Sequence, residues 1–168
     1  MLPATALLIN EYRFTHPLIA TPIVMKQEPN ENISPQAIVN DMLQQDLFSQ
    51  WLGITIVKIE KGYCQLQMTV RKEMCNGFGI AHGGIAFSLA DSALAFASNT
   101  HGRKAISIET SISHIKPIKT GDSIIATAIE KHMGSKIGVY EVSITKKDNT
   151  LVALFKGTVY RTTEQWTV

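Results

Sequence analysis

Cysteine is scarce in this chain, with only Cys64 and Cys75 among its 168 residues. Two cysteines are too few for a disulfide-stapled scaffold, and their spacing matches no metal-binding motif. We therefore expect a reducing, cytoplasmic environment. A large excess of one charge is also missing, because the formal net charge is only +2. This balance gives no electrostatic reason to expect nucleic acid or an anionic membrane as a partner.

Long apolar runs are absent as well, and no stretch is long enough to span a membrane. The first 24 residues are mildly apolar, but Glu11, Arg13 and three prolines interrupt them. They lack the basic start and the apolar centre of a signal peptide. We expect residues 1–33 to be an extension that is poorly ordered or packs on a partner subunit. Residues 34–168 are expected to form one domain.

The most informative stretch is residues 76–99, NGFGIAHGGIAFSLADSALAFASN. After its glycines, an apolar run from Ile85 to about Ser98 predicts a helix that is buried on most of its faces. Asp91 is the only charged residue in that helix. A carboxylate there is costly to desolvate unless it has a partner or a chemical task. Glycines at the helix start leave backbone amides open to a ligand, and such amides carry positive partial charge.

Short strands joined by tight turns are predicted around this helix. Ser34 and Pro35 begin an amphipathic helix, which Gly53 ends. Alternating apolar and polar residues then predict two strands before the buried helix and four after it, at about 54–59, 63–71, 104–116, 123–131, 136–146 and 151–162. Short connections favour a meander for the last four. The sequence thus predicts an α+β fold, with an antiparallel sheet wrapped around one long buried helix.

This pattern resembles a known family. The order Asn76-Gly77-x-Gly79-x-x-His82-Gly83-Gly84, followed by Ser88-Leu89-Ala90-Asp91, is similar to the PaaI group of hotdog-fold acyl-CoA thioesterases. The turn Gly134-Ser135-Lys136 and residues 153–157 also look like that group. The resemblance implies a hotdog fold and a homodimer with a continuous sheet, paired again into a tetramer. It implies active sites at the dimer interface, and an aryl-acetyl or medium-chain acyl-CoA as substrate, with no cofactor because coenzyme A is part of the substrate.

The resemblance also assigns roles to individual residues. Asp91 is expected to activate water or to attack the thioester itself. The Gly83 amide is expected to polarise the thioester carbonyl, facing Asp91 of the partner subunit. His82 would shape the loop and hydrogen-bond near the thioester, and Asn76 would help to place the carbonyl or the water. Ser107, on the strand after the helix, is a further candidate for orienting water.

Asp91, Gly83, Asn76 and Ser107 also have plainer interpretations, and His82 has an alternative catalytic one. Asp91 could cap a neighbouring element or pair with a lysine, and Gly83 could serve only a tight turn. Asn76 could stabilise its loop through a side-chain bond to the backbone. Ser107 could face solvent, whereas His82 could instead be a general base.

Coenzyme A carries phosphates, and a cation near a mobile phosphate adds affinity without tight geometry. The candidates for binding it are Gly134, Ser135 and Lys136 of the turn, with Lys131, Lys156 and Arg161. For any single lysine, a solvated surface charge is the plainer interpretation. The remaining histidines have no metal-ligand spacing and are interpreted as ordinary residues: His16, His101, His114 and His132.

Two other functions are compatible with the sequence. A hotdog hydratase or dehydratase would use His82 and Asp91 as acid and base, although the chain lacks the proline-rich histidine loop typical of the dehydratases. A non-catalytic acyl-CoA sensor is the other alternative, although the N-terminal extension is too short and not basic enough for a DNA-binding segment. Thiol release from acyl-CoA separates a thioesterase from both.

Overall fold

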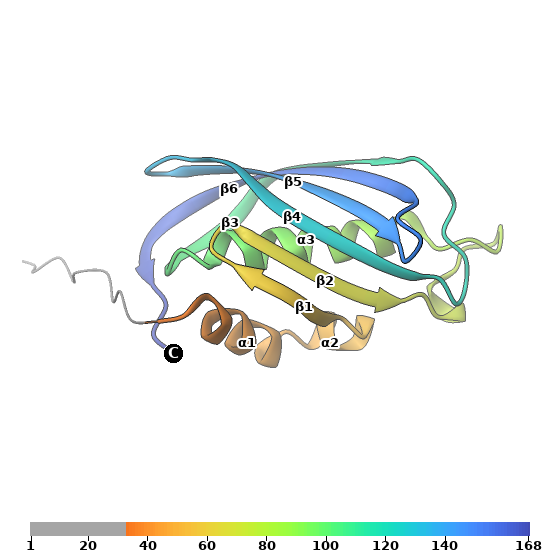
Figure 1. Cartoon of the computed structure of the whole chain (residues 1–168), viewed down its shortest axis with the longest axis horizontal. Coiled ribbons are helices and arrows are strands. Elements are labelled where there is room, and N and C mark those ends of the chain that lie inside the picture. The colour runs from red at the N-terminus through yellow and green to blue at the C-terminus, as the bar shows by residue number, and fades with distance from the viewer. Residues whose placement is uncertain (1–32) are drawn as a thin grey trace, which may run out of the picture.

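In the computed structural model, which describes residues 33–168, one long helix lies against a six-stranded antiparallel sheet (Figure 1). The helices are α1 (Pro35–Gln45), α2 (Leu47–Leu52) and α3 (Gly83–Asn99), with a 3-10 turn η1 (Lys72–Met74). The strands are β1 (Thr55–Glu60), β2 (Tyr63–Thr69), β3 (Arg103–His114), β4 (Ser123–Met133), β5 (Ile137–Lys146) and β6 (Leu151–Gln165). The expectation of an extension over residues 1–33 lies outside the described residues, apart from its last position.

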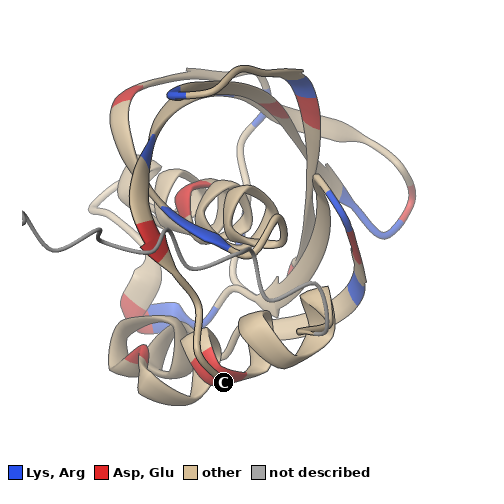
Figure 2. Cartoon of the chain, turned by 90° about the vertical axis from the view of Figure 1, so that its left-hand side faces the viewer, with Lys and Arg blue, Asp and Glu red and all other residues tan. Residues whose placement is uncertain are grey.

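Helix α3 is the centre of the core, as its apolar composition predicted. Seen along its axis, the sheet curls over α3, and α1 and α2 lie below it (Figure 2). The side chains of α3 that face the sheet are fully or almost fully buried, Leu89, Leu94 and Phe96 among them. They meet the inward side chains of the strands, such as Leu66 and Val142. The expected α+β architecture, a sheet wrapped around one buried helix, is therefore confirmed.

The order of the strands differs from the expected meander. The sheet runs β1-β2-β4-β5-β6-β3, so β4, β5 and β6 do form a meander, but β3 pairs with β6 at the edge. The segment after β3 crosses to β4, which pairs with β2. Local turn signals cannot reveal this crossing, because the partner of an edge strand depends on contacts far away in the sequence. Strand β3 has no partner on its outer side among the described residues.

The predicted N-terminal helix is broken into two. Helix α1 ends at Gln45, and the Asp46 carboxylate then accepts hydrogen bonds from the Phe48 and Ser49 amides, at 3.1 and 3.0 Å. Aspartate competes with helix continuation in this way because its short side chain can satisfy the free amides of a new first turn. Because the helix restarts at Leu47, Phe48 of α2 lies beside Phe87 and Asp91 of α3.

Strand β3 also departs from the expected alternation. Its pairing with β6 shifts register between Ser107 and Glu109, which marks a bulge. A bulge moves the side chains beyond it to the opposite face of the sheet. Ile106 and Ile108 are therefore more than half exposed, whereas Ile112 packs on the core. Uninterrupted alternation along residues 104–116 predicts one shared face for these three isoleucines, and the bulge makes that prediction wrong.

No helix within residues 33–168 is long and apolar enough to cross a membrane. Cys64 and Cys75 are free thiols, the first buried and the second partly exposed.

The closest approach between the sheet and α3 leads to a stability prediction. A β-carbon at Gly157 on β6 would overlap the side chain of Leu94, which is fully buried. Overpacking of this kind costs about 1–3 kcal/mol. We expect Gly157→Ala to lower the free energy of unfolding by about that amount in urea denaturation. Gly77→Ala is the matched control, because no atom lies within 4 Å of its added methyl group; equal losses in both variants would contradict the packing argument.

Candidate active site

The start of α3 leaves one backbone amide free. His82 precedes the helix in an extended conformation (φ −59°, ψ 139°), and its Nδ1 atom accepts a hydrogen bond from the Gly84 amide at 3.1 Å. The His82 carbonyl accepts another from the Ile85 amide at 2.9 Å. Within residues 33–168 the Gly83 amide has no acceptor. A free amide at a helix start attracts negative charge, because the helix dipole adds to its own polarity.

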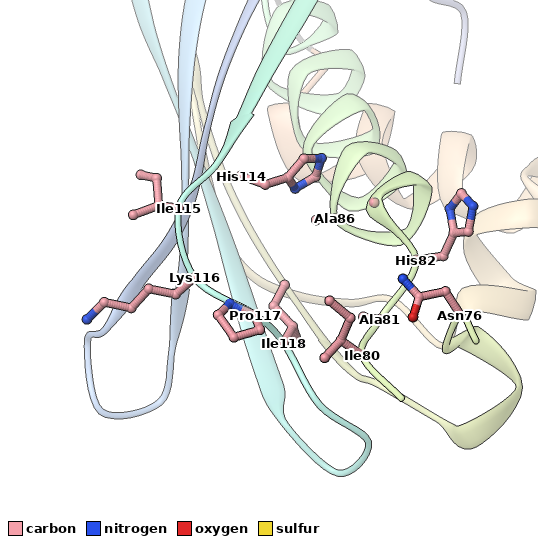
Figure 3. A pocket seen from close by; sticks show the side chains of 11 residues that line it. Asn76, Ile80, Ala81, His82, Ala86, His114, Ile115, Lys116, Pro117 and Ile118 are labelled. Atoms are coloured by element: carbon pink, nitrogen blue, oxygen red, sulfur yellow. The ribbon is translucent and has the colours of Figure 1, made fainter. Parts of the chain in front are cut away.

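Gly83 lines an open cavity of about 350 Å³, which lies between the start of α3 and the segment after β3 (Figure 3). Asn76, His82, His114 and Lys116 also line it. The Asn76 Oδ1 atom accepts a hydrogen bond from the Phe78 amide at 2.9 Å, which leaves its amide nitrogen without a partner within residues 33–168. The structure therefore brings Asn76, His82 and Gly83 together, as the motif suggested.

His114 is the residue of this cavity that sequence analysis missed. The sequence alone indicates an ordinary residue here, because His114 has no metal-ligand spacing. In the structure its ring reaches from the end of β3 toward the first turn of α3, with His82 on the other side of that turn (Figure 3). Strand periodicity places it on the same face as Ile112, which packs on the core, but the sequence could not show what that face would meet.

Asp91 lines a second, smaller cavity of about 170 Å³. Phe48 of α2 and Phe87 of α3 contribute its aromatic lining, and Asp46, Ser88, Ser92 and Ala95 line the rest. Phe87 packs edge-on against Phe155, with ring centroids 5.4 Å apart, and Phe48 stacks on Trp51 at 6.0 Å. Asp91 is half-buried, and desolvation raises the pKa of its carboxyl group above the usual range. A carboxylate with a raised pKa is a stronger base than a solvated one.

One chain does not bring Gly83 and Asp91 together. They lie eight positions apart on α3, which is about 12 Å along a helix that rises 1.5 Å per residue. They also line different cavities. A reacting carbon held at the Gly83 amide is thus out of reach of Asp91 of the same chain.

Ser107 lies apart from both cavities. It is exposed on β3, opposite Val159 of β6 and directly before the bulge. Its backbone is on the strand whose outer edge has no partner among residues 33–168, so Ser107 lies where a second chain could add to the sheet.

The residues predicted to bind coenzyme A lie elsewhere in the single chain. Gly134, Ser135 and Lys136 connect β4 to β5, and two arginines hold this connection in place. Arg103 donates to the Ser135 carbonyl at 3.1 Å and Arg161 to the Gly134 carbonyl at 2.8 Å. Because Arg103 begins β3 shortly after the end of α3, the connection lies at the opposite end of α3 from Gly83.

The two other lysines line a cavity on the outer face of the sheet. Lys131 and Lys156 both contribute to it, and Lys131 forms an ion pair with Glu141 at 2.9 Å. An exposed pair of this kind adds little stability. Neither lysine is close to Gly83 within one chain, since they face away from α3.

An antiparallel sheet curled around one long helix is the hotdog fold, as the sequence resemblance implied. The chain belongs to the Thioesterase superfamily, which its sequence matches over residues 78–153. It is 41% identical to a putative esterase of Archaeoglobus fulgidus, over 74% of this chain and 81% of that protein. The expected enzyme class, a thioester hydrolase, is confirmed at the level of the family.

Two further proteins that are similar to this chain are associated with acyl-CoA chemistry in their descriptions. The chain is 38% identical to the acyl-coenzyme A thioesterase PaaI of Escherichia coli, over 71% of this chain and 86% of that protein. The solved structure of E. coli PaaI superposes with a TM-score of 0.77, covering 79% of this chain and 96% of that chain. A Streptococcus mutans protein solved bound to acetyl CoA has a TM-score of 0.65 and 28% identity, covering 67% and 91%.

The raised pKa of Asp91 leads to a prediction about stability. Since the folded protein holds the Asp91 proton more tightly than the unfolded chain does, ionised Asp91 destabilises the fold. This penalty is absent below the usual carboxyl pKa and complete above the raised one. We expect Asp91→Asn to raise the melting temperature at neutral pH by up to about 3 °C, and the gain to vanish at acid pH.

The matched control for this prediction is Asp148→Asn. Hydrogen bonding to Thr150 lowers the pKa of Asp148, so its ionised form is favoured in the folded state and its loss brings no gain. Thermal melts of both variants between pH 3 and 8 measure the difference. A fall in melting temperature for Asp91→Asn at neutral pH would show that Asp91 has a stabilising partner.

Proposed function

We propose that this protein hydrolyses acyl-CoA thioesters to the free carboxylic acid and coenzyme A. The observation that carries this proposal is the single free amide of Gly83 at the start of α3, opening into a cavity. A fixed amide dipole of this kind stabilises the oxyanion that forms when a thioester carbonyl is attacked. The likeness to E. coli acyl-coenzyme A thioesterase PaaI and to the acetyl CoA-bound protein of S. mutans supports the same substrate class.

In the proposed reaction Asp91 supplies the base or the nucleophile. As a base, its carboxylate takes a proton from water while the water oxygen bonds to the carbonyl carbon. The carbonyl oxygen becomes an oxyanion, which accepts a hydrogen bond from the Gly83 amide. When the oxyanion collapses, the bond to sulfur breaks, coenzyme A leaves as a thiolate and the proton on Asp91 returns to solvent or sulfur. As a nucleophile, Asp91 would form an anhydride that water then cleaves.

The cavity beside Asp91 is the proposed place for the acyl group. Phe48 and Phe87 supply the apolar part of its lining and suit an apolar acyl group, whereas Asp46, Ser88 and Ser92 supply polar atoms. A cavity of about 150 Å³ accommodates a benzene ring, so about 170 Å³ fits an aryl-acetyl or a short to medium-chain acyl group. Coenzyme A would extend toward the turn Gly134, Ser135 and Lys136, with Lys131 and Lys156 as further proposed cations.

A homodimer that shares its active sites completes this proposal. Because Gly83 and Asp91 of one chain are about 12 Å apart along α3, the Gly83 amide needs Asp91 of the partner subunit. Strand β3 supports such a pairing, since its outer edge is unpaired within residues 33–168 and exposes Ile106 (59%) and Ile108 (55%). A long apolar edge strand aggregates unless another strand covers it. Antiparallel pairing of β3 with its copy would continue the sheet across the dimer.

The first prediction from this proposal concerns thiol release. We expect the wild type to release thiol from a panel of aryl-acetyl and straight-chain acyl-CoA substrates. Asp91→Ala should lower kcat at least about 100-fold, since a lost base costs 10²–10⁴-fold. Release is followed with a colorimetric thiol reagent, and dimer formation with light scattering.

Each outcome of that assay bears on a different part of the proposal. If Asp91→Ala remains dimeric and keeps wild-type activity, Asp91 is structural and the assigned mechanism is wrong. If the wild type hydrates a crotonyl thioester without releasing thiol, the protein is a hydratase. Tight binding of acyl-CoA with no turnover would instead support a sensor.

The second prediction concerns sharing of the site. Gly83→Pro removes the amide hydrogen but suits the first position of a helix, and the extended backbone of His82 is what proline requires before it. We expect Gly83→Pro to be far less active than Gly83→Ala, which has the same added β-carbon but keeps the amide. After subunits of Gly83→Pro and Asp91→Ala are mixed and exchanged, about a quarter of wild-type activity should return, because half of the dimers then contain one intact site.

The unmixed variants and a mixture made without subunit exchange are the controls. Recovery only after exchange means that Gly83 and Asp91 act across two chains. If exchange occurs, as shown by a tagged subunit, and no activity returns, each site is formed within one chain.

A further inference from the structure

The ring of His114 lies against Gly83. Its Nε2 atom is 3.0 Å, and its Cε1 atom 3.4 Å, from the position that a β-carbon on Gly83 would occupy. The absence of a side chain at position 83 is therefore what leaves room for this imidazole. Figure 3 shows the ring directed from the end of β3 toward the first turn of α3.

This contact sets a limit on the distance between two potential donors. With standard bond lengths, the Gly83 amide nitrogen is about 2.5 Å from that β-carbon position. The His114 Nε2 atom therefore lies within about 5.5 Å of the amide nitrogen. Two donors can share one oxygen, each at about 2.9 Å, when they are no more than about 5.8 Å apart. Both groups can consequently reach a single carbonyl oxygen in the cavity.

Among the side chains of this cavity other than that of the adjoining His82, that of His114 supplies the three atoms nearest to the β-carbon position of Gly83. The Nδ1 atom of His82 is occupied by the Gly84 amide, so the His82 ring is held as the cap of α3. The Oδ1 atom of Asn76 is bonded to the Phe78 amide, and its amide nitrogen is a further donor that lines the cavity. The His114 ring is exposed and has no hydrogen-bond partner within residues 33–168. Both ring nitrogens of His114 are therefore available to a ligand, whereas His82 has only its Nε2 atom available.

We propose that His114 is a catalytic residue, whose Nε2–H group donates a second hydrogen bond to the thioester carbonyl oxygen beside the Gly83 amide. This inference rests on the proposed function. As the tetrahedral intermediate forms, negative charge grows on that oxygen, and each fixed donor is bonded more strongly by the oxyanion than by the ground-state carbonyl. His114 therefore lowers the barrier more than it strengthens substrate binding.

Three substitutions test this role. In His114→Gln the amide nitrogen sits at about the same reach as Nε2, whereas in His114→Asn it sits at the shorter reach of Nδ1. His114→Phe keeps the volume and the planar shape of the ring without a donor. We expect kcat to fall about 10- to 100-fold in His114→Phe and His114→Asn, with KM changed less than about threefold. His114→Gln should keep at least about a third of wild-type kcat.

His132→Phe is the matched control. His132 is an exposed histidine of β4, at the opposite end of α3, and lines neither cavity. Thiol release from the best acyl-CoA of the panel gives kcat and KM, and thermal melting together with light scattering verifies folding and dimer formation. If His114→Phe does not fold, the comparison of the Gln and Asn variants still tests the role of His114, because a polar side chain is tolerated at this exposed position.

The outcomes separate this inference from the function on which it rests. If the wild type is active and depends on Asp91, but His114→Phe and His114→Asn keep wild-type kcat, only the role of His114 is overturned. Equal losses in the Gln and Asn variants overturn it as well, because the reach of the donor would not matter. If the wild type releases no thiol from any substrate, the proposed function and the role of His114 both fail.

Discussion

The packing of helix α3 inside the curled sheet is the constraint on which the other features depend. The sheet can approach this closely because α3 presents alanines between its larger side chains, and because Gly157 leaves space for Leu94. Close packing at this density allows little sliding or rotation of the helix. The start of α3 is thereby held at the mouth of one cavity and Asp91 in the wall of another, and neither position can be changed without disturbing the core.

The chemistry of the start of α3 follows from how its amides are used. His82 takes up two of the first three amides, one through its ring and one through its carbonyl, so that the Gly83 amide is left as a directed donor. Asp91, two turns further on, is only half-buried, because α1 and α2 cover that side of α3 less completely than the sheet covers the other. Its partial desolvation destabilises the ionised form. Functional sites commonly combine such a loss of folding stability with a more reactive side chain.

Much of the local structure was predictable from residue patterns. The strict alternation through Cys64, Leu66 and Met68 gave the correct inward face of β2, and the unbroken apolar run gave α3. The errors occurred where a short polar side chain or a register shift outweighed the pattern. Asp46 started a new helix within a continuous helical periodicity, and the bulge after Ser107 reversed the faces of β3. Such features depend on single hydrogen bonds and on the pairing with the partner strand. The periodicity of apolar residues along the chain contains no information about either.

The sequence by itself determined the elements that are local: the glycine-rich start of α3, its capping histidine and its one carboxylate, which form a contiguous motif that specified the thioesterase family. Only the tertiary structure decided what faces that motif. It placed His114 against Gly83, because β3 pairs with β6 at the sheet edge and ends beside the first turn of α3. It also placed Phe48 beside Asp91, because α2 turns at Asp46. Contacts between distant segments are set by the order of the strands and by the packing of the core. Neither is specified by any local stretch of the chain.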